Sequence, residues 1–390
     1  MITVVGIGAD GWDGLGATAR AALLAAPSVM GSARQLALLP PAVGAAHELL
    51  PTPLAPALDA FAARDALCLL ASGDPMLHGI GATLARLVPP ERLRVIPAVS
   101  SVALAAARLG WPSGELTVLS LVTAPVDTVA AVLVPGRRLL LLARDGGTAD
   151  LVAAVLADRG WGASTLTVLS DLGGASEAVG PHTGGPTADL AVLAVECRPD
   201  TGTAPLPLVP GLPDEAFDSD GALTRREVRA VVLAALRPTP GELLWDVGAG
   251  SGSIGIEWLR AGGGGALAVE PRPGRLERIT ANAARLGVPS LRTVAGQAPA
   301  VLLGLSAPQA VFIGGGLSVA GVVERCWEAL SPGGRLVATA VTVETETLVH
   351  AWRVRVGGRL TRMELSRAAP LGGFTAWRPE LPIVVWEVTR

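Results

Sequence analysis

The chain has 390 residues, a net charge of -3 and a hydrophobic fraction of 50%, while aromatic residues make up only 3%. This length suits two domains, and the apolar content excludes a disordered chain. The sequence contains no lysine, which excludes a Schiff-base lysine and the lysine of a phosphate-binding P-loop. The slightly acidic balance gives no sign of a nucleic-acid or membrane partner.

Short β-rich runs alternate with alanine-rich helical runs through the first 200 residues. Strands are expected at Ile2–Val5, Ala66–Leu70, Leu93–Ile96, Leu116–Leu119, Arg138–Leu142, Thr165–Leu169 and Leu190–Val195. Helices are expected at Gly16–Ala26, Gly79–Leu87, Ser100–Leu109, Val126–Leu133 and Thr148–Asp158. Alternation of this kind predicts an α/β fold with mainly parallel sheets that are covered by helices.

The segment Thr201–Phe217 is rich in proline and glycine and has no helical or strand periodicity. Such a segment is typical of a linker. We therefore expect a domain over residues 1–200, a linker over 201–213 and a second domain over 214–390.

The alternation restarts after this linker. Thr224–Leu236 is a predicted helix, with Thr224 as N-cap and Glu227 three residues later forming a capping box. Strands are expected at Leu243–Val247, Ala266–Val269, Leu291–Val294, Ala310–Ile313 and Leu336–Thr339, and helices at Ile254–Arg260, Arg275–Leu286 and Val319–Leu330. The final strands, Leu360–Leu365 and Ile383–Val388, have no helix between them, which predicts a parallel sheet that ends in an antiparallel hairpin.

The first glycine-rich loop has the pattern G-x-G-x-x-G, formed by Gly6, Gly8 and Gly11. A dinucleotide site of this type requires an acidic residue about 20 positions further on. Residues 17–35 contain no Asp or Glu, so the pattern favours a tight strand-to-helix turn over a binding site for NAD.

The second glycine-rich loop, Asp246–Ser253, lies between a predicted strand and a predicted helix. Glu270 ends the next strand and can accept both ribose hydroxyls of a nucleoside. The helix that begins near Ser253 offers its N-terminus to a carboxylate, and Asp246 can meet an ammonium group. The three loop glycines, which let backbone N–H groups approach a ligand, are Gly248, Gly250 and Gly252. This pattern favours S-adenosylmethionine, with NAD or a purely structural turn as alternatives.

The cysteines and histidines show no metal-ligand spacing, so no metal is expected. Cys68, Cys197 and Cys326 lie far apart, as buried cysteines of a reducing cytoplasm do. Residues 1–8 have the pattern of a strand and not of a signal peptide, and no apolar run reaches the roughly 18–20 residues of a membrane span. A cytoplasmic location is the resulting expectation.

Residues from about 214 to 390 resemble the CbiT-type methyltransferases of cobalamin biosynthesis. The matching segments are LTRREVRA (Leu223–Ala230), WDVGAGSGSIGIEW (Trp245–Trp258), AVEPRP (Ala268–Pro273), AGQAP (Ala295–Pro299) and FIGGG (Phe312–Gly316). The family usually has lysine near position 225, where this chain has Arg225. The resemblance implies that Thr224, Gln297 and Ala298 join the glycine loop in binding S-adenosylmethionine.

Residues 1 to about 200 resemble the CbiE-type enzymes, which are tetrapyrrole methylases with two α/β lobes and the cofactor between them. The matching segments are VVGIGADG (Val4–Gly11), ASGDPMLHGIG (Ala71–Gly81), IPAVSSVALAAARLG (Ile96–Gly110) and LSDLGGASEAVG (Leu169–Gly180). The resemblance implies a cofactor site formed by Gly8, Gly73, Asp74, Leu77, Ser100 and Ser101. As alternatives, Asp74 caps a turn, and Ser100 and Ser101 cap the following helix.

The fused order resembles the precorrin-6Y C5,15-methyltransferases (decarboxylating). This resemblance implies methylation of C5 by the first domain, and methylation of C15 with removal of the C12 acetate carboxyl group by the second. Two molecules of S-adenosylmethionine would be used, and the second domain would have a class I Rossmann-like fold. The resemblance also implies a homo-oligomer, with dimers typical of CbiE-type and tetramers of CbiT-type domains.

Candidate substrate contacts lie in the second domain. Arg225 and Arg226 can pair with the carboxylates of the macrocycle, although a solvated helix face would explain them equally well. Gly314, Gly315 and Gly316 follow a strand and leave room for a bulky ring. The alternatives are a cobalt-containing substrate, another small molecule or RNA, and a non-catalytic S-adenosylmethionine sensor; the lack of a basic surface excess argues against RNA.

Overall fold

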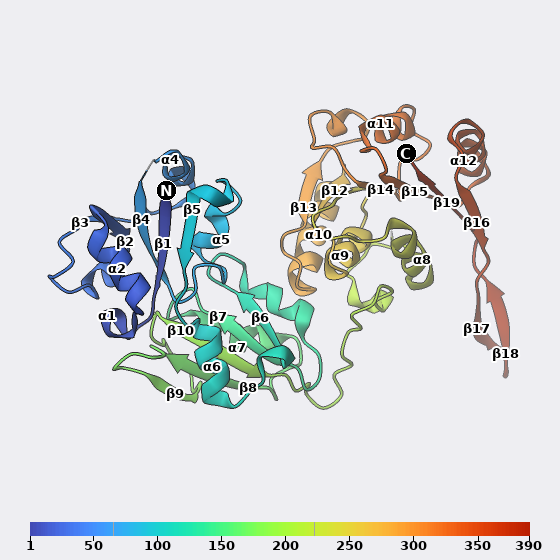
Figure 1. Ribbon diagram of the computed structural model, residues 1–390. Helices are drawn as coiled ribbons and strands as arrows, with labels where there is room; N and C mark the ends of the chain where they lie inside the picture. The colour runs from blue at the N-terminus through green and yellow to red at the C-terminus, as the bar shows by residue number, and fades with distance from the viewer. Residues whose placement is uncertain (65, 222) are drawn as a thin grey trace. The chain divides into compact units, whose positions relative to one another are not determined.

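The computed structural model describes residues 1–64, 66–221 and 223–390. The chain forms two compact units (Figure 1). The first contains Met1–Val126 and Val134–Thr203, and the second contains Asp127–Leu133 and Ala204–Arg390. Each unit has its own sheets and its own hydrophobic core.

The first sheet of the first unit is entirely parallel, with strand order β3-β2-β4-β1-β5. Its strands are β1 (Ile2–Ile7), β2 (Ser28–Gly31), β3 (Ala46–Leu49), β4 (Leu67–Ser72) and β5 (Leu93–Ile96). The accompanying helices are α1 (Gly11–Gly14), α2 (Ala17–Ala25), α3 (Ala33–Ala37), η1 (Ala55–Ala57), α4 (Leu58–Ala63), α5 (Ile80–Leu84) and η2 (Pro90–Arg92). Apolar residues of β1 and β4 alternate between two core clusters, Val5 facing one and Val4 the other, so helices cover both faces.

The second sheet of this unit has the order β6-β7-β10-β8-β9 and is mostly antiparallel. Its strands are β6 (Leu116–Ser120), β7 (Arg138–Leu142), β8 (Thr165–Ser170), β9 (Ala178–Pro181) and β10 (Ala191–Glu196). Its helical segments are α6 (Ser101–Leu109), η3 (Ser113–Glu115) and α7 (Thr148–Asp158). Among the described strands of this sheet, β6 and β7 pair in parallel, whereas β10 runs antiparallel to both β7 and β8, and β9 runs antiparallel to β8. The prediction of mainly parallel sheets is therefore wrong for this lobe.

The predicted α-helix at Val126–Leu133 is a 3-10 helix, η4 (Val126–Val132). Pro125 and Pro135 flank this short segment, and short tight helices of this kind serve as connectors.

The second unit contains a seven-stranded sheet with the order β13-β12-β11-β14-β15-β19-β16. Its strands are β11 (Leu243–Val247), β12 (Gly265–Glu270), β13 (Arg292–Ala295), β14 (Ala310–Ile313), β15 (Arg335–Ala340), β16 (Arg359–Met363) and β19 (Ile383–Thr389). Its helices are η5 (Asp214–Ala216), α8 (Arg226–Leu236), α9 (Ser253–Arg260), α10 (Pro273–Arg285), η6 (Ala300–Leu302), α11 (Val322–Ala329) and α12 (Val343–Val356). β19 runs antiparallel to both β15 and β16, as the sequence predicts for the end of the sheet.

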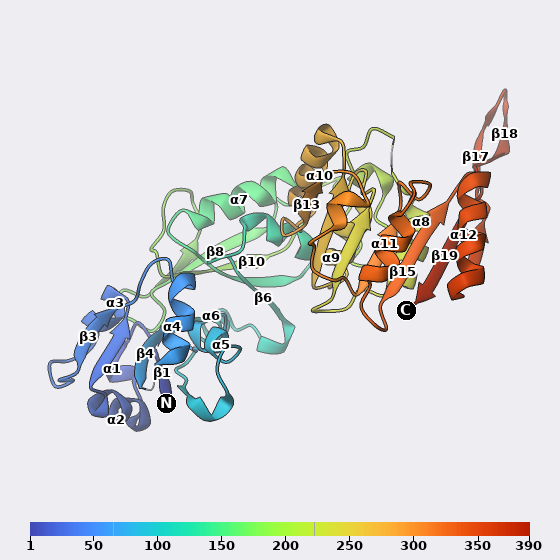
Figure 2. The same ribbon diagram turned by 90° about the horizontal axis from the view of Figure 1, so that it is seen from above.

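Strand alternation divides the core of this unit into two layers. The helices that accompany this sheet, α8 to α12, are labelled in Figure 2. Leu244 of β11 faces a cluster with residues of α8, α9 and α10. Its neighbour Trp245 faces a cluster with residues of α11 and α12. The sheet is thus buried on both sides, which leaves the ends of its strands as the places where a ligand can approach.

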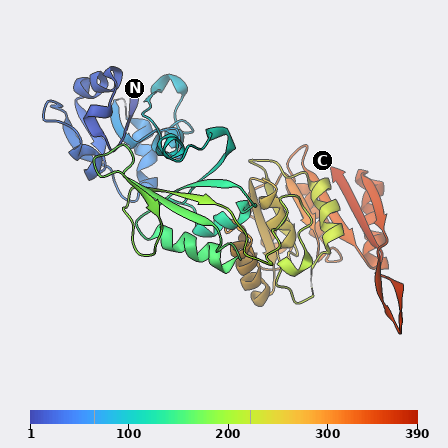
Figure 3. The same ribbon diagram turned by 90° about the horizontal axis from the view of Figure 1, so that it is seen from below.

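A two-stranded ribbon, β17 (Ser366–Leu371) and β18 (Phe374–Pro379), extends from the end of this sheet (Figure 3). The sequence prediction placed no strands there. The turn contains Gly372 at a φ of +59°, and exposed apolar side chains include Phe374 at 83% and Trp377 at 75%. In the described residues the ribbon forms a separate two-stranded sheet.

The predicted capping box at the start of α8 is wrong. The helix begins at Arg226, its N-cap is Arg225, and no side chain caps it. Glu227 instead accepts hydrogen bonds from Arg367, at 2.8 Å for the closer one, and the Thr224 carbonyl accepts one from Arg229. Glu227 thus contacts a distant strand, and Thr224 accepts through its backbone carbonyl, so neither side chain makes the local bond that the pattern indicates.

All three cysteines are buried. Burial raises the pKa of the thiols of Cys68 and Cys197 to about 11 and that of Cys326 to about 12. Across the described ranges, no helix is both long and apolar enough to cross a bilayer.

Candidate functional site

A cleft with a volume of about 550 Å³ lies in the first unit, where the ends of its two sheets meet. Its walls come from the ends of β1, β4, β7 and β8 and from the start of β10. The six residues predicted from the first half of the sequence all line it: Gly8, Gly73, Asp74, Leu77, Ser100 and Ser101. The volume lies within the roughly 300–1,000 Å³ of small-molecule sites.

Close backbone packing and backbone conformation explain why glycine occupies two positions of the first glycine-rich loop. A Cβ atom on Gly6 would lie 2.2 Å from the Gly73 carbonyl oxygen and 2.6 Å from the Ala98 nitrogen. Gly11 has a φ of +60°, which side chains rarely allow. The pattern G-x-G-x-x-G is therefore accounted for by the turn, as the sequence favoured.

The polar residues at the floor of the cleft also cap local structure. Oδ1 of Asp74 accepts a hydrogen bond from the Met76 backbone at 2.8 Å. Oγ of Ser100 accepts one from the Ala103 backbone at 3.1 Å, as the N-cap of α6. Each oxygen keeps a second lone pair, so capping and ligand binding are compatible.

Two arginines that the sequence analysis did not single out also line this cleft, Arg34 and Arg144. Each follows a strand by two or three residues, Arg34 after β2 and Arg144 after β7. A basic residue directly after a buried strand is the signal that could have identified them, because ligands bind at strand ends.

A second cavity, of about 180 Å³, lies at the carboxyl ends of β11 to β14 in the second unit. Six predicted residues line it: Gly248, Glu270, Gln297, Ala298, Gly315 and Gly316. Its volume is below the roughly 300 Å³ at which pockets enclose a whole drug-sized ligand. The cavity therefore has room for only part of a nucleoside-sized ligand.

The second glycine loop packs directly against the FIGGG segment. A Cβ atom on Gly248 would lie 2.6 Å from the Gly315 Cα atom, and Gly248 has a φ of +73°. Glycine is thus required at position 248 for backbone approach. Gly314 is exposed, and Gly316 has a φ of +76° and lines the cavity.

Glu270 is almost fully buried at the end of β12, with 2% of its surface exposed. Its Oε2 accepts a hydrogen bond from the Gly250 backbone at 3.1 Å, and its Oε1 accepts one from the Arg272 backbone at 3.2 Å. Since a carboxylate offers about four acceptor positions, it retains capacity to accept from a diol.

Asp246 is only 1% exposed and does not line the cavity. Its Oδ2 accepts a hydrogen bond from the Gly255 backbone at 3.0 Å, whereas Oδ1 has no partner. Burial raises the pKa of Asp246 to about 7; the Gly255 N–H opposes this shift and the charge of Glu270 adds to it. A buried carboxyl oxygen without a partner marks a place that a cationic group or water would stabilise.

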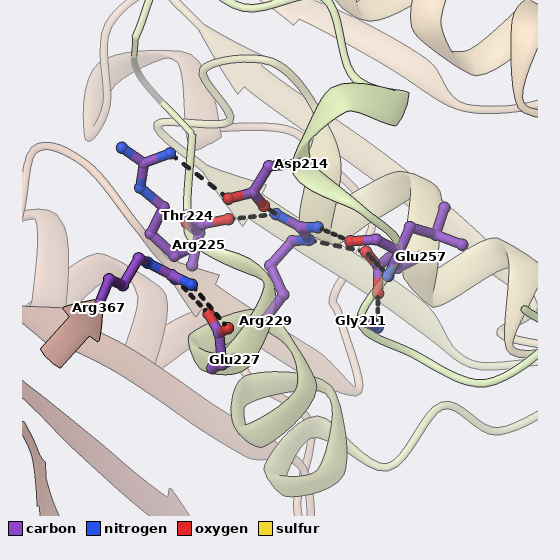
Figure 4. A network of polar contacts seen from close by, with 9 residues as sticks. Gly211, Asp214, Thr224, Arg225, Glu227, Arg229, Glu257 and Arg367 are labelled. Carbon is purple, nitrogen blue, oxygen red and sulfur yellow. Dashed lines mark hydrogen bonds and ion pairs between the residues drawn. The ribbon is translucent and has the colours of Figure 1, made fainter. Parts of the chain in front are cut away.

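The remaining predicted residues do not line this cavity. Gly250, Gly252 and Ser253 are buried within the loop and the start of α9. Thr224, Arg225 and Arg226 lie at the start of α8, where Arg225 forms an ion pair with Asp214 at 3.4 Å (Figure 4). Arg226 is exposed.

The same region contains a buried charge network (Figure 4). Arg229, with no exposed surface, binds Glu257 and Asp214, each at 2.7 Å. Glu257 also accepts hydrogen bonds from the backbones of Gly211 and Leu212. The network fixes residues 211–214 of the second unit against α8 and α9. The sequence analysis did not identify it.

The two units correspond to two families of methyltransferase domains. Residues 1–185 match the tetrapyrrole (corrin/porphyrin) methylases, and residues 215–390 match the precorrin methyltransferase domain. These matches and the two folds therefore define a protein with two methyltransferase domains of different architecture.

Full-length relatives identify the particular family. The chain is 45% identical to a precorrin-6Y C(5,15)-methyltransferase [decarboxylating] of Sinorhizobium sp, over 100% of this chain and 96% of the relative. It is 43% identical to the protein of the same name from Mycobacterium tuberculosis (strain CDC 1551 / Oshkosh), over 100% of both chains. The crystal structure of the C-terminal domain of precorrin-6Y C5,15-methyltransferase from Rhodobacter capsulatus matches with 47% identity and a TM-score of 0.46, over 47% of this chain and 100% of that one. The chain belongs to the precorrin-6Y C(5,15)-methyltransferase (decarboxylating) family.

Proposed function

We propose that this protein methylates C5 and C15 of a precorrin-6Y macrocycle and removes the carboxyl group of the C12 acetate side chain. The observation that carries the proposal is identity above 40% along the whole chain to two relatives named for this activity. The presence of a strand-end cavity in each unit supports a division of the two methylations between them.

We propose one S-adenosylmethionine site in each unit. In the first, Asp74, Ser100 and Ser101 would contact the cofactor beside Gly8, Gly73 and Leu77. In the second, Glu270 would accept hydrogen bonds from the ribose, with Gln297 and Ala298 beside it. The unpartnered Oδ1 of Asp246 fits a nearby ammonium group, reached through water, since Asp246 does not line the cavity. Bound S-adenosylmethionine supplies a methyl carbon that is activated by the positive sulfur.

The chain's own contribution to methyl transfer is alignment and exclusion of water. The cleft of the first unit has apolar walls that include Leu77, Leu104 and Leu172. Such walls hold a flat conjugated ring and keep water from the reacting carbon. Fixing the two reactants in line can lower the barrier by several kcal/mol, so a strong catalytic base is not required.

Decarboxylation is proposed for the second unit. Arg225 and Arg226 remain the proposed contacts for carboxylates of the macrocycle, with Gly314 and Gly315 leaving space beside the ring. Arg225 is 56% exposed and its ion pair with Asp214 is long, at 3.4 Å, so its guanidinium retains donors for a ligand.

We also propose that the protein is a homo-oligomer that associates through the β17–β18 ribbon. Phe374 and Trp377 are at least 75% exposed on this ribbon, and Leu371 is 61% exposed. Apolar side chains grouped on a protruding strand pair mark an interaction surface, and strand edges favour pairing with another copy.

The direct test is mass spectrometry of precorrin-6Y after incubation with the full chain and S-adenosylmethionine. The proposal expects a gain of two methyl groups and the loss of one carbon dioxide. Binding of the cofactor with return of an unmodified macrocycle would refute the substrate assignment.

A further inference from the structure

We propose that Arg34 and Arg144 form a two-point carboxylate clamp that holds the macrocycle in the cleft of the first unit. This inference rests on the proposed function and adds the residues that set the position of the substrate there. The clamp is defined as these two guanidinium groups, which both line the 550 Å³ cleft.

The two arginines come from different sheets. Arg34 lies on α3, directly after β2 of the parallel sheet, while Arg144 follows β7 of the mostly antiparallel sheet. Contacts from the two lobes of the cleft would fix both the depth and the rotation of a disc-shaped ligand. Rotation determines which carbon of the ring faces the methyl donor, so the clamp bears on the site of methylation.

Each guanidinium is held in place but keeps free donors. Arg34 donates from Nη2 to Oγ of Ser72 at 2.8 Å. Arg144 donates from Nε to the Val122 carbonyl at 3.1 Å and from Nη2 to the Ala124 carbonyl at 3.2 Å. A guanidinium has five N–H donors, so these bonds orient each group and leave donors for a carboxylate.

Neither cation is neutralised by the protein. Among the described residues no carboxylate forms an ion pair with Arg34 or Arg144, whereas Arg64 pairs with Glu48 at 2.9 Å and Arg108 pairs with Glu177. The charges of Arg34 and Arg144 therefore remain available to a ligand that enters the cleft they both line.

The acids of the cleft are engaged with the backbone. Oδ1 of Asp74 accepts from Met76, and Oδ1 of Asp189 accepts from the Gly146 backbone at 3.1 Å. The remaining walls are largely apolar. Two oriented cations on an apolar wall complement an apolar ring that carries carboxylate side chains, which is the chemistry of a precorrin.

S-adenosylmethionine also carries a carboxylate, so the test must show whether the two arginines bind the carboxylates of the macrocycle or that of the cofactor. Arg34→Ala and Arg144→Ala variants of the full chain would be compared with the parent protein. Arg86→Ala is the matched control, because Arg86 is an exposed arginine of the same unit that does not line the cleft. For each protein, two quantities are measured: the KM for the macrocycle in the mass-spectrometric assay, and the stoichiometry and Kd of S-adenosylhomocysteine by calorimetry.

Each cleft variant is expected to raise the KM for the macrocycle roughly tenfold or more, the size expected for a lost charge-assisted hydrogen bond. Binding of S-adenosylhomocysteine should stay unchanged, and Arg86→Ala should match the parent protein. Arg34→Lys should recover part of the KM, since lysine keeps the charge and loses the fork. A thermal melt confirms that each variant is folded.

Two results would overturn the clamp. One is an unchanged KM for the macrocycle in both cleft variants. The other is weaker binding of S-adenosylhomocysteine with an unchanged KM, which would assign the arginines to the cofactor. If the parent protein leaves the macrocycle unmodified, the proposed function fails and the clamp fails with it; an active parent with unaffected variants refutes the clamp alone.

Discussion

Arg229 and Glu257 form an ion pair that solvent does not reach, with Nε and Oε1 2.7 Å apart and side-chain exposures of 0% and 1%. The pair joins α8 to α9, and both residues also bind the backbone of Leu212. A buried pair of this kind is costly to break, because the charge that remains is left in a low-dielectric interior.

Replacement of Glu257 by glutamine is therefore expected to destabilise the second unit by about 3 kcal/mol. Asp214 still neutralises part of the charge of Arg229 in this variant. The expected loss of stability therefore lies at the lower end of the range for broken buried ion pairs. Urea unfolding followed by tryptophan fluorescence measures it. Arg225→Ala is the control: this exposed residue pairs with Asp214 at 3.4 Å, so its loss should cost less than about 1 kcal/mol. Equal effects of the two variants would contradict the assigned role of the buried pair.

The stability of the second unit should depend on pH through Asp246. Burial raises its pKa in the folded state from 3.8 to about 7. The native state thus holds a proton that the unfolded state releases, so the free energy of unfolding falls as the pH rises from about 4 to about 7. Asp246→Asn should show a smaller decline in the urea midpoint between pH 5 and pH 8. An identical decline in both proteins would show that Asp246 titrates normally.

Gly248→Ala should abolish cofactor binding in the second unit. The new Cβ atom would lie 2.6 Å from the Gly315 backbone. The alanine would also have to adopt a φ of +73°, which is unfavourable for any residue with a side chain. Calorimetry with S-adenosylhomocysteine should show a stoichiometry that falls from two to one per chain. Gly262→Ala isolates the effect of φ, because that residue has a φ of +94° with open space around its Cβ position. Two retained sites in Gly248→Ala would argue against binding at this loop.

The ribbon predicts an effect on association. Combined Phe374→Ser and Trp377→Ser should shift the protein toward smaller species, because both side chains are exposed in the single chain and would be buried between copies. Light scattering after size-exclusion chromatography measures the mass. Leu151→Ser, a change at an exposed leucine of α7 in the other unit, should leave the mass unchanged. An unchanged mass in the ribbon variant would exclude the ribbon as the interface.

Local patterns in the sequence predicted most elements of the fold. Strands β5 and β7 and helix α7 have the predicted bounds, because each is a short apolar or periodic segment bounded by turn residues. The direction of β10 could not be predicted, since its residues are apolar in either orientation and strand direction depends on distant pairing. The strands β17 and β18 were not predicted, because most of their residues are exposed. Their sequence therefore lacks the alternation of apolar and polar residues that marks a strand with one buried face.

Some residues of the candidate sites could also be predicted from the sequence, and others could not. Glycine loops are visible in sequence because special backbone geometry demands glycine, as at Gly248. The arginines of the clamp, Arg34 and Arg144, are 110 positions apart and come together only when two sheets meet at one cleft. The capping box predicted at Thr224 is absent because the helix begins at Arg226, one residue later than a cap at Thr224 requires. Glu227 pairs instead with Arg367, which is 140 residues away and cannot be found from the local pattern.

The central claim is that the two units carry separate methylation sites. Its most direct test is the mass of precorrin-6Y after turnover with the parent chain and with the full-length Gly248→Ala variant. We expect two added methyl groups and loss of carbon dioxide with the parent chain, and one added methyl group with the carboxyl group retained in the variant. Two methylations with decarboxylation by the variant, or an unmodified macrocycle with the parent chain, would contradict the claim.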